Sequence, residues 1–138
     1  MPSDSNAAAR VQAVLDIPLH RFVGMELLDP ADPPAGIWFP VGPAAQNQVR
    51  LLHGGVVTAL LDVAGYLALM PHLTDDEHAV THDQSVSLLR PVPADRRVEL
   101  RGTVLRRGRA VAFLRADATV EGTLVATAQL TKTVVPAG

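Results

Sequence analysis

The sequence predicts an α+β fold in which one apolar helix lies across a curved antiparallel sheet. The stretch from Gly54 to about Met70 is rich in Ala and Leu, contains no Pro and stops at Pro71, as expected of a helix interior. Four long segments in the second half of the chain have the pattern of strands joined by short turns, which is typical of an antiparallel meander. One helix lying across such a sheet is the simplest assembly that buries the helix.

The composition fits one folded domain of 138 residues, since 48% of the residues are hydrophobic and 19% are charged. We expect a single domain over residues 1–138, with residues 1–17 as an N-terminal helical segment. The net charge of -2 argues against a nucleic-acid partner. The lack of cysteine excludes disulfides, thiolate metal sites and a cysteine nucleophile. The polar, Ala-rich start from Met1 to Arg10 contains no visible signal peptide, so a cytoplasmic location is expected.

Short elements precede the apolar helix. Ala7 to Leu15 is predicted to form a helix that Pro18 ends. Phe22 to Leu28 and Ile37 to Val41 are predicted strands, with proline-containing turns between them. A loop is then expected from Gly42 to Leu52.

The apolar segment is predicted to be a buried helix and not a membrane span. From Leu51 to Thr74 the only formal charge is Asp62. A membrane span needs about 20 mainly apolar residues, and a carboxylate in the middle of a bilayer is costly. The run here is shorter and carries its acid in the middle, so no membrane association is expected. Gly65 inside this helix predicts that another backbone packs closely against it there.

Four segments after the helix are predicted to be strands. They are Val80 to Leu89, Val98 to Leu105, Val111 to Val120 and Leu124 to Val135. In the last segment Leu124, Ala126, Ala128 and Leu130 share one face. Small residues on such inner faces allow the helix to approach the sheet closely.

Two glycines at the start of the predicted helix, Gly54 and Gly55, are the first candidate feature for chemistry. The first N–H groups of a helix have no partner within it, and the positive end of the helix dipole lies there. Such donors suit a carbonyl oxygen that gains negative charge during a reaction, and glycine lets a ligand approach the main chain. His53 directly before them can add a side-chain donor, or it can simply cap the helix.

Asp62 is the second feature, because it is the only charge in the apolar helix. No Lys or Arg stands at the helix-neighbour positions 58, 59, 65 and 66, so no local ion pair is available. A buried, unpaired carboxylate is costly, and such a cost is usually tolerated for a function. A structural acid that accepts hydrogen bonds from helix or loop N–H groups is the alternative.

The spacing of these two features predicts an oligomer. Asp62 follows His53 by nine residues, which is about 13 Å along a helix axis. The glycine donors and the acid of one chain are therefore too far apart to act on one atom. Two chains paired about a two-fold axis would place the start of one helix against the middle of the other. We expect a homodimer or homotetramer whose sites combine Gly55 of one subunit with Asp62 of its partner.

The run from Asn47 to Asp62 resembles the active-site segment of the PaaI-like branch of the 4-hydroxybenzoyl-CoA thioesterase superfamily. The matching features are Asn47, His53-Gly54-Gly55, the acid Asp62, Thr81, the run from Ser85 to Pro91 and the run from Arg106 to Arg109. The resemblance covers the chain from Phe22 to Val134, and its one departure is Arg50, where the family usually has a Gly. It implies a hotdog fold, in which a curved antiparallel sheet of five to six strands wraps a long central helix, and it implies hydrolysis of acyl-CoA.

The resemblance also implies a role for each matching residue. Asp62 would be the general base or the nucleophile toward the thioester carbon, and the Gly55 N–H would polarise the thioester carbonyl. Asn47 and His53 would bind near that carbonyl, whereas an ordinary turn residue is the alternative for Asn47. Thr81 would position water or the acid, and an ordinary strand residue is its alternative.

Further residues are candidates for binding the coenzyme A part of the substrate. They are Gly54, Arg90, Arg107, Gly108 and Arg109. Arginine suits phosphate oxygens, although an exposed basic hairpin explains the same pattern. The remaining histidines are scattered and form no spaced ligand set, so neither a metal nor a separate cofactor is expected. A hydratase or dehydratase acting on acyl thioesters and a non-catalytic acyl-CoA binding protein remain the alternative functions.

Overall fold

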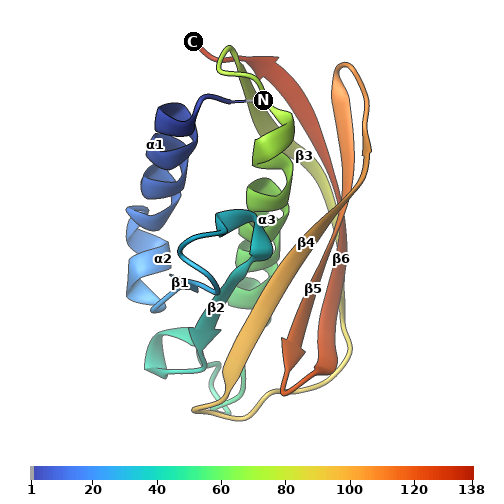
Figure 1. Cartoon of the computed structure of the whole chain (residues 1–138). Coiled ribbons are helices and arrows are strands. Elements are labelled where there is room, and N and C mark those ends of the chain that lie inside the picture. The colour runs from blue at the N-terminus through green and yellow to red at the C-terminus, as the bar shows by residue number, and fades with distance from the viewer. Residues whose placement is uncertain (1) are drawn as a thin grey trace.

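The computed structural model describes residues 2–138 as a curved antiparallel sheet that wraps one long helix (Figure 1). The helices are α1 (Asp4–Leu15), α2 (Pro18–Phe22) and α3 (Gly54–Leu69). The strands are β1 (Glu26–Leu27), β2 (Ile37–Pro40), β3 (Glu77–Leu88), β4 (Arg97–Arg107), β5 (Val111–Val120) and β6 (Thr123–Pro136). Their order in the sheet is β1-β2-β4-β5-β6-β3. The predicted α+β hotdog architecture is therefore confirmed, with six strands.

Helix α3 forms the centre of the core, between the sheet and the layer of α1 and α2 (Figure 1). It begins at Gly54 as predicted, and a short 3-10 turn at Met70–His72 follows it. Gly54–His72 is long and apolar enough to cross a membrane by length and composition. Half of that stretch, however, is buried inside the structure, because the concave face of the sheet packs against it.

The N-terminal segment differs from the prediction. Pro18 was predicted to end the first helix, but it is also the first residue of a second helix, α2. Its fixed φ and missing N–H suit the first turn of a helix. Phe22 belongs to that helix, so the strand predicted from Phe22 to Leu28 shrinks to the two residues of β1. Gly24, with a φ of 79°, turns the chain between the two elements.

The closest approach of helix and sheet is at Gly102 of β4 and not at Gly65, as the sequence had suggested. A Cβ on Gly102 would lie 2.5 Å from the backbone oxygen of Ala64 in α3. A Cβ on Gly65 would meet only side-chain atoms, the nearest at 3.5 Å on Leu130. The backbone that needs a bare Cα is therefore in the sheet, because the strand there passes directly over the helix main chain.

These two glycines make opposite predictions for stability. Gly102→Ala should lower the free energy of unfolding by about 1 to 3 kcal/mol, since the helix and strand must move apart. Gly65→Ala should leave the free energy of unfolding unchanged or raise it by up to about 1 kcal/mol, because alanine favours the helix and its Cβ would meet side chains only at ordinary contact distances. Urea denaturation of both variants beside the wild type measures the difference. Equal effects of the two substitutions would contradict this account of the helix–sheet contact.

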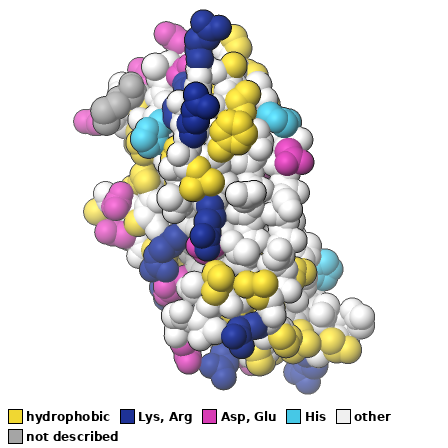
Figure 2. Space-filling model, turned by 90° about the vertical axis from the view of Figure 1, so that its right-hand side faces the viewer, with side chains coloured by type: hydrophobic (Ala, Val, Ile, Leu, Met, Phe, Trp, Pro, Cys, Tyr) yellow, Lys and Arg dark blue, Asp and Glu magenta, His cyan; other side chains and the backbone are white. Residues whose placement is uncertain are grey.

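Strand β3 forms one edge of the sheet, because it pairs only with β6 among the described residues. Its register shifts between Thr81 and Asp83, so His82 is an extra residue in the strand. The bulge allows both Thr81 and Gln84 to point toward α3, where they bind Asp62 and the Thr58 carbonyl. The outer face of the sheet carries both basic and apolar side chains (Figure 2). Leu105 of β4 and Phe113 of β5 are among the exposed large apolar side chains.

Candidate active site

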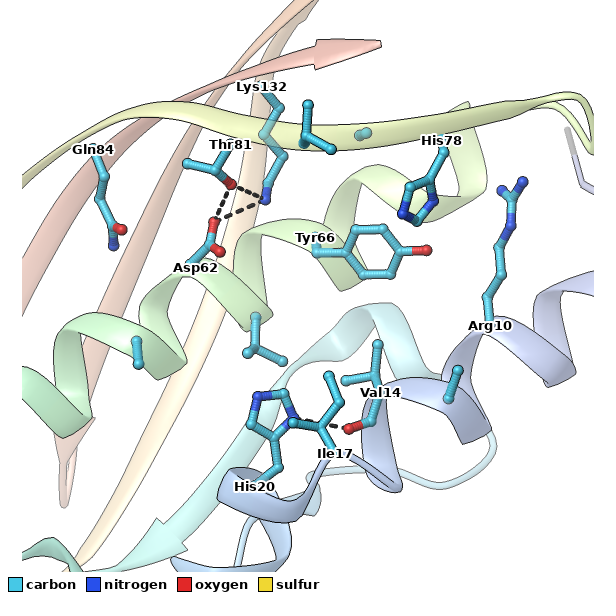
Figure 3. A pocket seen from close by; sticks show the side chains of 15 residues that line it. Arg10, Val14, Ile17, His20, Asp62, Tyr66, His78, Thr81, Gln84 and Lys132 are labelled. Carbon is cyan, nitrogen blue, oxygen red and sulfur yellow. Dashed lines mark hydrogen bonds and ion pairs between the residues drawn. The ribbon is translucent and has the colours of Figure 1, made fainter. Parts of the chain in front are cut away.

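Asp62 lies at the centre of a three-residue network on the inner side of β3 and β6 (Figure 3). Its Oδ1 accepts hydrogen bonds from Thr81 Oγ1 at 2.5 Å and from Lys132 Nζ at 2.8 Å. The Lys132 ammonium also donates to Thr81 Oγ1 at 2.6 Å. Because the threonine oxygen accepts from the lysine, its own proton is directed at the carboxylate. No hydrogen bond of the described residues reaches the other carboxylate oxygen, Oδ2.

The expectation of an unpaired carboxylate was wrong, because Lys132 is its ion-pair partner. The side chain of Lys132 is only 3% exposed, whereas that of Asp62 is 36% exposed. The lysine comes from β6, seventy residues farther along the chain. The residues near Asp62 in the sequence therefore could not reveal this ion pair. One signal was available: Lys132 is the single lysine of the chain, and it continues the inward alternation of Leu124 to Leu130.

The network forms part of the wall of a cavity of about 860 Å³ between α1, α3 and β3. Apolar side chains supply much of the remaining wall, among them Val14, Ile17 and Val63. A cavity of this size can hold a small organic group. Asp62 thus presents a carboxylate, anchored through one oxygen, to a space large enough for a substrate.

The start of α3 is capped by its own histidine. His53 is the N-cap residue, and its Nδ1 accepts a hydrogen bond from the Gly55 N–H at 2.9 Å. An accepting Nδ1 places the ring proton of a neutral imidazole on Nε2. The Gly55 N–H, expected to face a thioester carbonyl, therefore has a side-chain partner here, and His53 Nε2–H is a second donor at the same place.

Asn47 closes the loop before α3. Its Oδ1 accepts hydrogen bonds from the N–H groups of Val49 and Leu51, both at 3.0 Å. Arg50, within this loop, has a φ of 63°, a left-handed conformation that favours glycine. The glycine that the resemblance predicts at this position would adopt this conformation without strain, and the loop keeps its turn with an arginine in its place. Asn47 is a loop-forming residue whose Nδ2 alone remains for a ligand.

Within one chain the predicted residues fall into separate cavities. Asp62 and Thr81 line the large cavity, whereas His53 and Gly55 line a smaller apolar one of about 220 Å³. The residues Asn47, Gly54 and Arg90 share a third, of about 270 Å³. Among residues 2–138, no group of three or more His, Asp or Glu side chains is placed to hold a metal.

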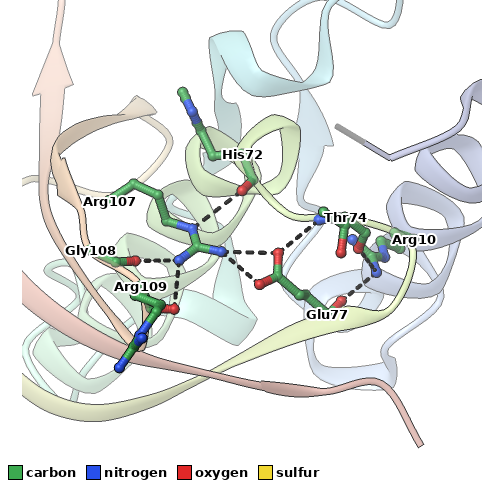
Figure 4. A network of polar contacts seen from close by, with 7 residues as sticks. All are labelled: Arg10, His72, Thr74, Glu77, Arg107, Gly108 and Arg109. Atoms are coloured by element: carbon green, nitrogen blue, oxygen red, sulfur yellow. Dashed lines mark hydrogen bonds and ion pairs between the residues drawn. The ribbon is translucent and has the colours of Figure 1, made fainter.

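Arg107 is a structural residue and is not free to bind phosphate (Figure 4). Its Nη2 donates to both carboxylate oxygens of Glu77 at 2.9 Å, and its Nε donates to the His72 carbonyl at 3.3 Å. Its Nη1 donates to the carbonyls of Gly108 and Arg109. The guanidinium thereby ties the β4–β5 turn to the end of α3 and the start of β3. No hydrogen bond of the Arg109 or Arg90 side chain is present among the described residues.

The Glu77–Arg107 pair predicts a pH dependence of stability. Hydrogen bonds from the Thr74 backbone and from Arg107 hold the pKa of Glu77 below its ordinary value. A lowered folded-state pKa adds stability above the ordinary glutamate pKa of about 4.3, and this contribution is lost as the pH falls through the lowered value. Glu77→Gln should therefore be less stable than the wild type at pH 7 and approach it in acid.

Urea midpoints between pH 7 and pH 3 measure this convergence. Glu121→Gln is the matched control, because Glu121 pairs with Arg96 on the surface and is 80% exposed, so its effect should be small throughout. A constant difference between Glu77→Gln and the wild type at every pH would contradict the prediction.

Comparisons with known proteins agree with this geometry. The family model of the thioesterase superfamily matches residues 50–133, more than half of the chain. No curated protein matches the sequence significantly. A mutant of the phenylacetic acid degradation protein PaaI from Thermus thermophilus is 28% identical, with a TM-score of 0.74 over 85% of this chain and 98% of that one.

Two more distant structures share the fold. A thioesterase from Haemophilus influenzae is 24% identical, with a TM-score of 0.81 over 93% of this chain and 90% of that one. A protein from Bacillus halodurans, solved with CoA, is 20% identical, with a TM-score of 0.79 over 95% of this chain and 84% of that one. The predicted resemblance to PaaI-like proteins is thus confirmed, and the chain belongs to the thioesterase superfamily.

Proposed function

We propose that the protein hydrolyses acyl-CoA thioesters to the free acid and coenzyme A, with Asp62 as its reactive carboxylate. The observation that carries this proposal is the anchoring of Asp62 Oδ1 by Thr81 and Lys132 at the wall of a large cavity, which leaves Oδ2 without a protein partner. Membership of the thioesterase superfamily supports the reaction type. The CoA in the structure of the Bacillus halodurans protein supports the substrate class.

The unbonded oxygen of Asp62, Oδ2, could act in the hydrolysis in either of two ways. As a general base, Oδ2 takes a proton from water while the water oxygen adds to the thioester carbon. The tetrahedral intermediate then collapses, the C–S bond breaks, and the thiolate of coenzyme A takes up a proton. As a nucleophile, Oδ2 itself adds to the carbon and expels the thiolate, and water hydrolyses the resulting anhydride. Lys132 and Thr81 hold the same oxygen in place in both cases.

The carbonyl oxygen gains negative charge in either path, and the start of α3 would stabilise it. The donors there are the Gly55 N–H and His53 Nε2–H, at the positive end of the helix dipole. Because His53 Nδ1 now accepts from Gly55, an arriving carbonyl would share that N–H or displace the ring. Gly54 and Arg90, which share a cavity with Asn47, and the free Arg109 would bind the coenzyme A portion.

A two-fold pairing of β3 would bring the two halves of this site together. An edge strand of twelve residues offers unpaired backbone groups to a second copy. In one chain Thr81 contacts Asp62, while a Cβ on Gly54 would meet Leu88. Antiparallel pairing centred between Gln84 and Ser85 would set Thr81 of one chain opposite Leu88 of the other. The acid of each subunit would then face the helix start of its partner, in a homodimer or in a homotetramer built from such dimers.

Complementation between two inactive variants tests this shared site. Gly55→Pro removes one donor in the first helical turn, where proline is tolerated, and Asp62→Asn removes the base. If each site combines two chains, a heterodimer of the variants holds one intact site and one doubly altered site. A random one-to-one mixture should then regain about a quarter of wild-type activity. Activity no higher than that of the separate variants would place both residues of a site in one chain.

Release of free thiol from a panel of acyl-CoAs tests the function itself. Short, medium, branched and aromatic acyl groups should be compared, because the acyl preference is open. Binding without thiol release would favour an acyl-CoA binding protein. Conversion of enoyl-CoA to hydroxyacyl-CoA without release would favour a hydratase. A cytoplasmic location stays a prediction, for which cell fractionation is the test.

A further inference from the structure

Three polar side chains, Arg10, Tyr66 and His78, lie at one end of the large cavity, beyond Asp62 along α3 (Figure 3). They come from three elements, namely α1, α3 and β3. The hydroxyl of Tyr66 points toward the guanidinium of Arg10, and the ring of His78 lies beside both. The middle of the cavity wall is mostly apolar, so this end forms a separate polar group of side chains.

Arg10 makes no direct ion pair among the described residues, although its charge helps to lower the pKa of the nearby Asp75, after the hydrogen bonds that Asp75 accepts from Asn6 and Ser3. Its Nη2 donates to the backbone carbonyls of Thr74, Asp75 and Glu77, at 3.0, 3.4 and 2.5 Å. Its Nη1 is shielded from water and has no hydrogen-bond partner. No acid of the described residues lies within 4.0 Å of the guanidinium. An unpaired donor beside a cavity costs stability that a bound acceptor would restore.

Tyr66 and His78 add two further groups able to donate hydrogen bonds. Their rings meet edge to face, with centroids 6.0 Å apart, and neither side chain has a hydrogen-bond partner among the described residues. Burial raises the pKa of the Tyr66 hydroxyl, while the charge of Arg10 opposes that rise. The hydroxyl therefore stays a donor at neutral pH, and it lies within the field of the guanidinium.

The distance from the reactive carboxylate limits the size of the group that fits. Tyr66 follows Asp62 by four residues on the same helix face, a rise of about 6 Å. His78 precedes Thr81 by three residues in an extended strand, a span of about 10 Å. An acyl group bound with its carbonyl at Asp62 would thus reach the polar end after a short chain.

We propose that this cavity binds the acyl group of the substrate and selects acyl chains that end in a carboxylate, which Arg10, Tyr66 and His78 would receive. The proposal rests on the hydrolysis of acyl-CoA proposed above and names its substrate class: CoA thioesters of short dicarboxylic acids, such as glutaryl- and adipoyl-CoA. A carboxylate accepts several hydrogen bonds and could form the direct ion pair that Arg10 does not make among the described residues. A small movement of the side chain would bring the free Nη1–H to it.

The phosphates of coenzyme A are a poorer match for this end of the cavity. They carry several negative charges, whereas Arg10 is the one cation here that is not already paired, since Lys132 is bound to Asp62. The apolar wall beside Asp62 also suits methylene groups better than a nucleotide. A neutral hydroxyl at the end of the acyl chain would satisfy the donors but would leave the charge unpaired.

Matched substrates test the proposal on the full-length protein. Adipoyl-CoA and hexanoyl-CoA have the same number of carbon atoms and differ by one terminal carboxylate. The wild type should show a kcat/KM about tenfold or more higher for adipoyl-CoA. Arg10→Met should lower the adipoyl-to-hexanoyl ratio about 10- to 100-fold, and Tyr66→Phe, which keeps the ring, should lower it about 2- to 10-fold. Arg101→Met, on the outer face of the sheet, is the control and should leave the ratio unchanged.

The outcomes separate this proposal from the proposed function. Equal loss of both activities in Arg10→Met would assign Arg10 to the common CoA portion and overturn the proposal, as would a wild-type preference for hexanoyl-CoA. If no thioester is hydrolysed, calorimetric binding to the Asp62→Asn protein still decides, since adipoyl-CoA should bind more tightly than hexanoyl-CoA. Because Arg10 also ties α1 to the start of β3, Tyr66→Phe keeps the test valid should Arg10→Met fail to fold.

Discussion

Asp62→Asn should lower kcat for acyl-CoA hydrolysis by about 10³-fold or more, because an amide neither takes a proton nor attacks the thioester. Asparagine keeps the shape of the side chain. Its carbonyl oxygen can still accept from Thr81 and Lys132, which now bind Asp62 Oδ1. We therefore expect a folded protein with a moderately lower Tm, since the buried lysine loses its counter-charge. Steady-state kinetics and thermal denaturation of the purified variant measure both effects.

Asp83→Asn is the matched control for this substitution. Asp83 lies on the same edge strand, just past the bulge, and its side chain is exposed. The same loss of one negative charge there should leave kcat within about twofold of the wild type. Retention of more than a tenth of the activity by Asp62→Asn would remove Asp62 from the reaction.

Lys132→Met should lower kcat by about 100-fold with little change in KM, the second largest effect that we expect. The lysine touches Asp62 and Thr81 but lies behind them, 3% exposed, so we class it as a positioning residue. Without it, the carboxylate loses one of the two bonds that hold Oδ1 and samples other rotamers. Loss of positioning lowers the rate of the bound complex, while the surfaces that bind substrate remain.

The division between kcat and KM distinguishes positioning from a general loss of structure. Gln129→Met on the same strand is the control, because that side chain is exposed on the outer face of the sheet, and it should retain wild-type kinetics. A proportional rise in KM in Lys132→Met, or a loss of activity that only follows the loss of folded protein, would contradict a positioning role.

The sequence predicted the helices and strands well where a hydrophobic pattern ran over many residues. Strand β5 has the bounds predicted for it, Val111–Val120, and α3 begins at the predicted Gly54. The N-terminal part did not follow, because five residues are too few to show a period and Pro18 is compatible with either the end or the start of a helix. Local sequence likewise places a glycine in a helix but does not show which strand crosses the helix there. The close contact therefore lies at Gly102 and not at the predicted Gly65.

The sequence predicted those residues of the candidate site whose chemistry differs from that of their neighbours in the chain. Asp62 is the one acid in an apolar helix, and the structure confirms that Thr81 contacts it. Lys132 and Arg10 were missed, since their partners are 70 and more than 60 residues away in the chain. Arg107 was a candidate for binding coenzyme A beside the alternative of an exposed basic hairpin, and its ion pair with Glu77 on another strand was not visible in the sequence. Contacts between side chains on different strands depend on strand order and register. The alternation of apolar and polar residues along each strand does not reveal either of these.

Because His82 is an extra residue in β3, the number of residues between Thr81 and Gln84 decides which side chains reach the active site. Before His82 the odd-numbered side chains of β3 face α3, and after it the even-numbered ones do. Both Thr81 and Gln84 therefore reach the helix. Deleting His82 would leave a regular strand with Thr81 and Gln84 still on one face, whereas inserting a residue between them would turn one half of the strand inside out. The hydroxyl would leave Asp62 or the amide would leave Thr58, although no functional side chain had been altered. Insertions in this part of the strand should therefore be tolerated far less than deletion of His82 or substitutions at its outward positions.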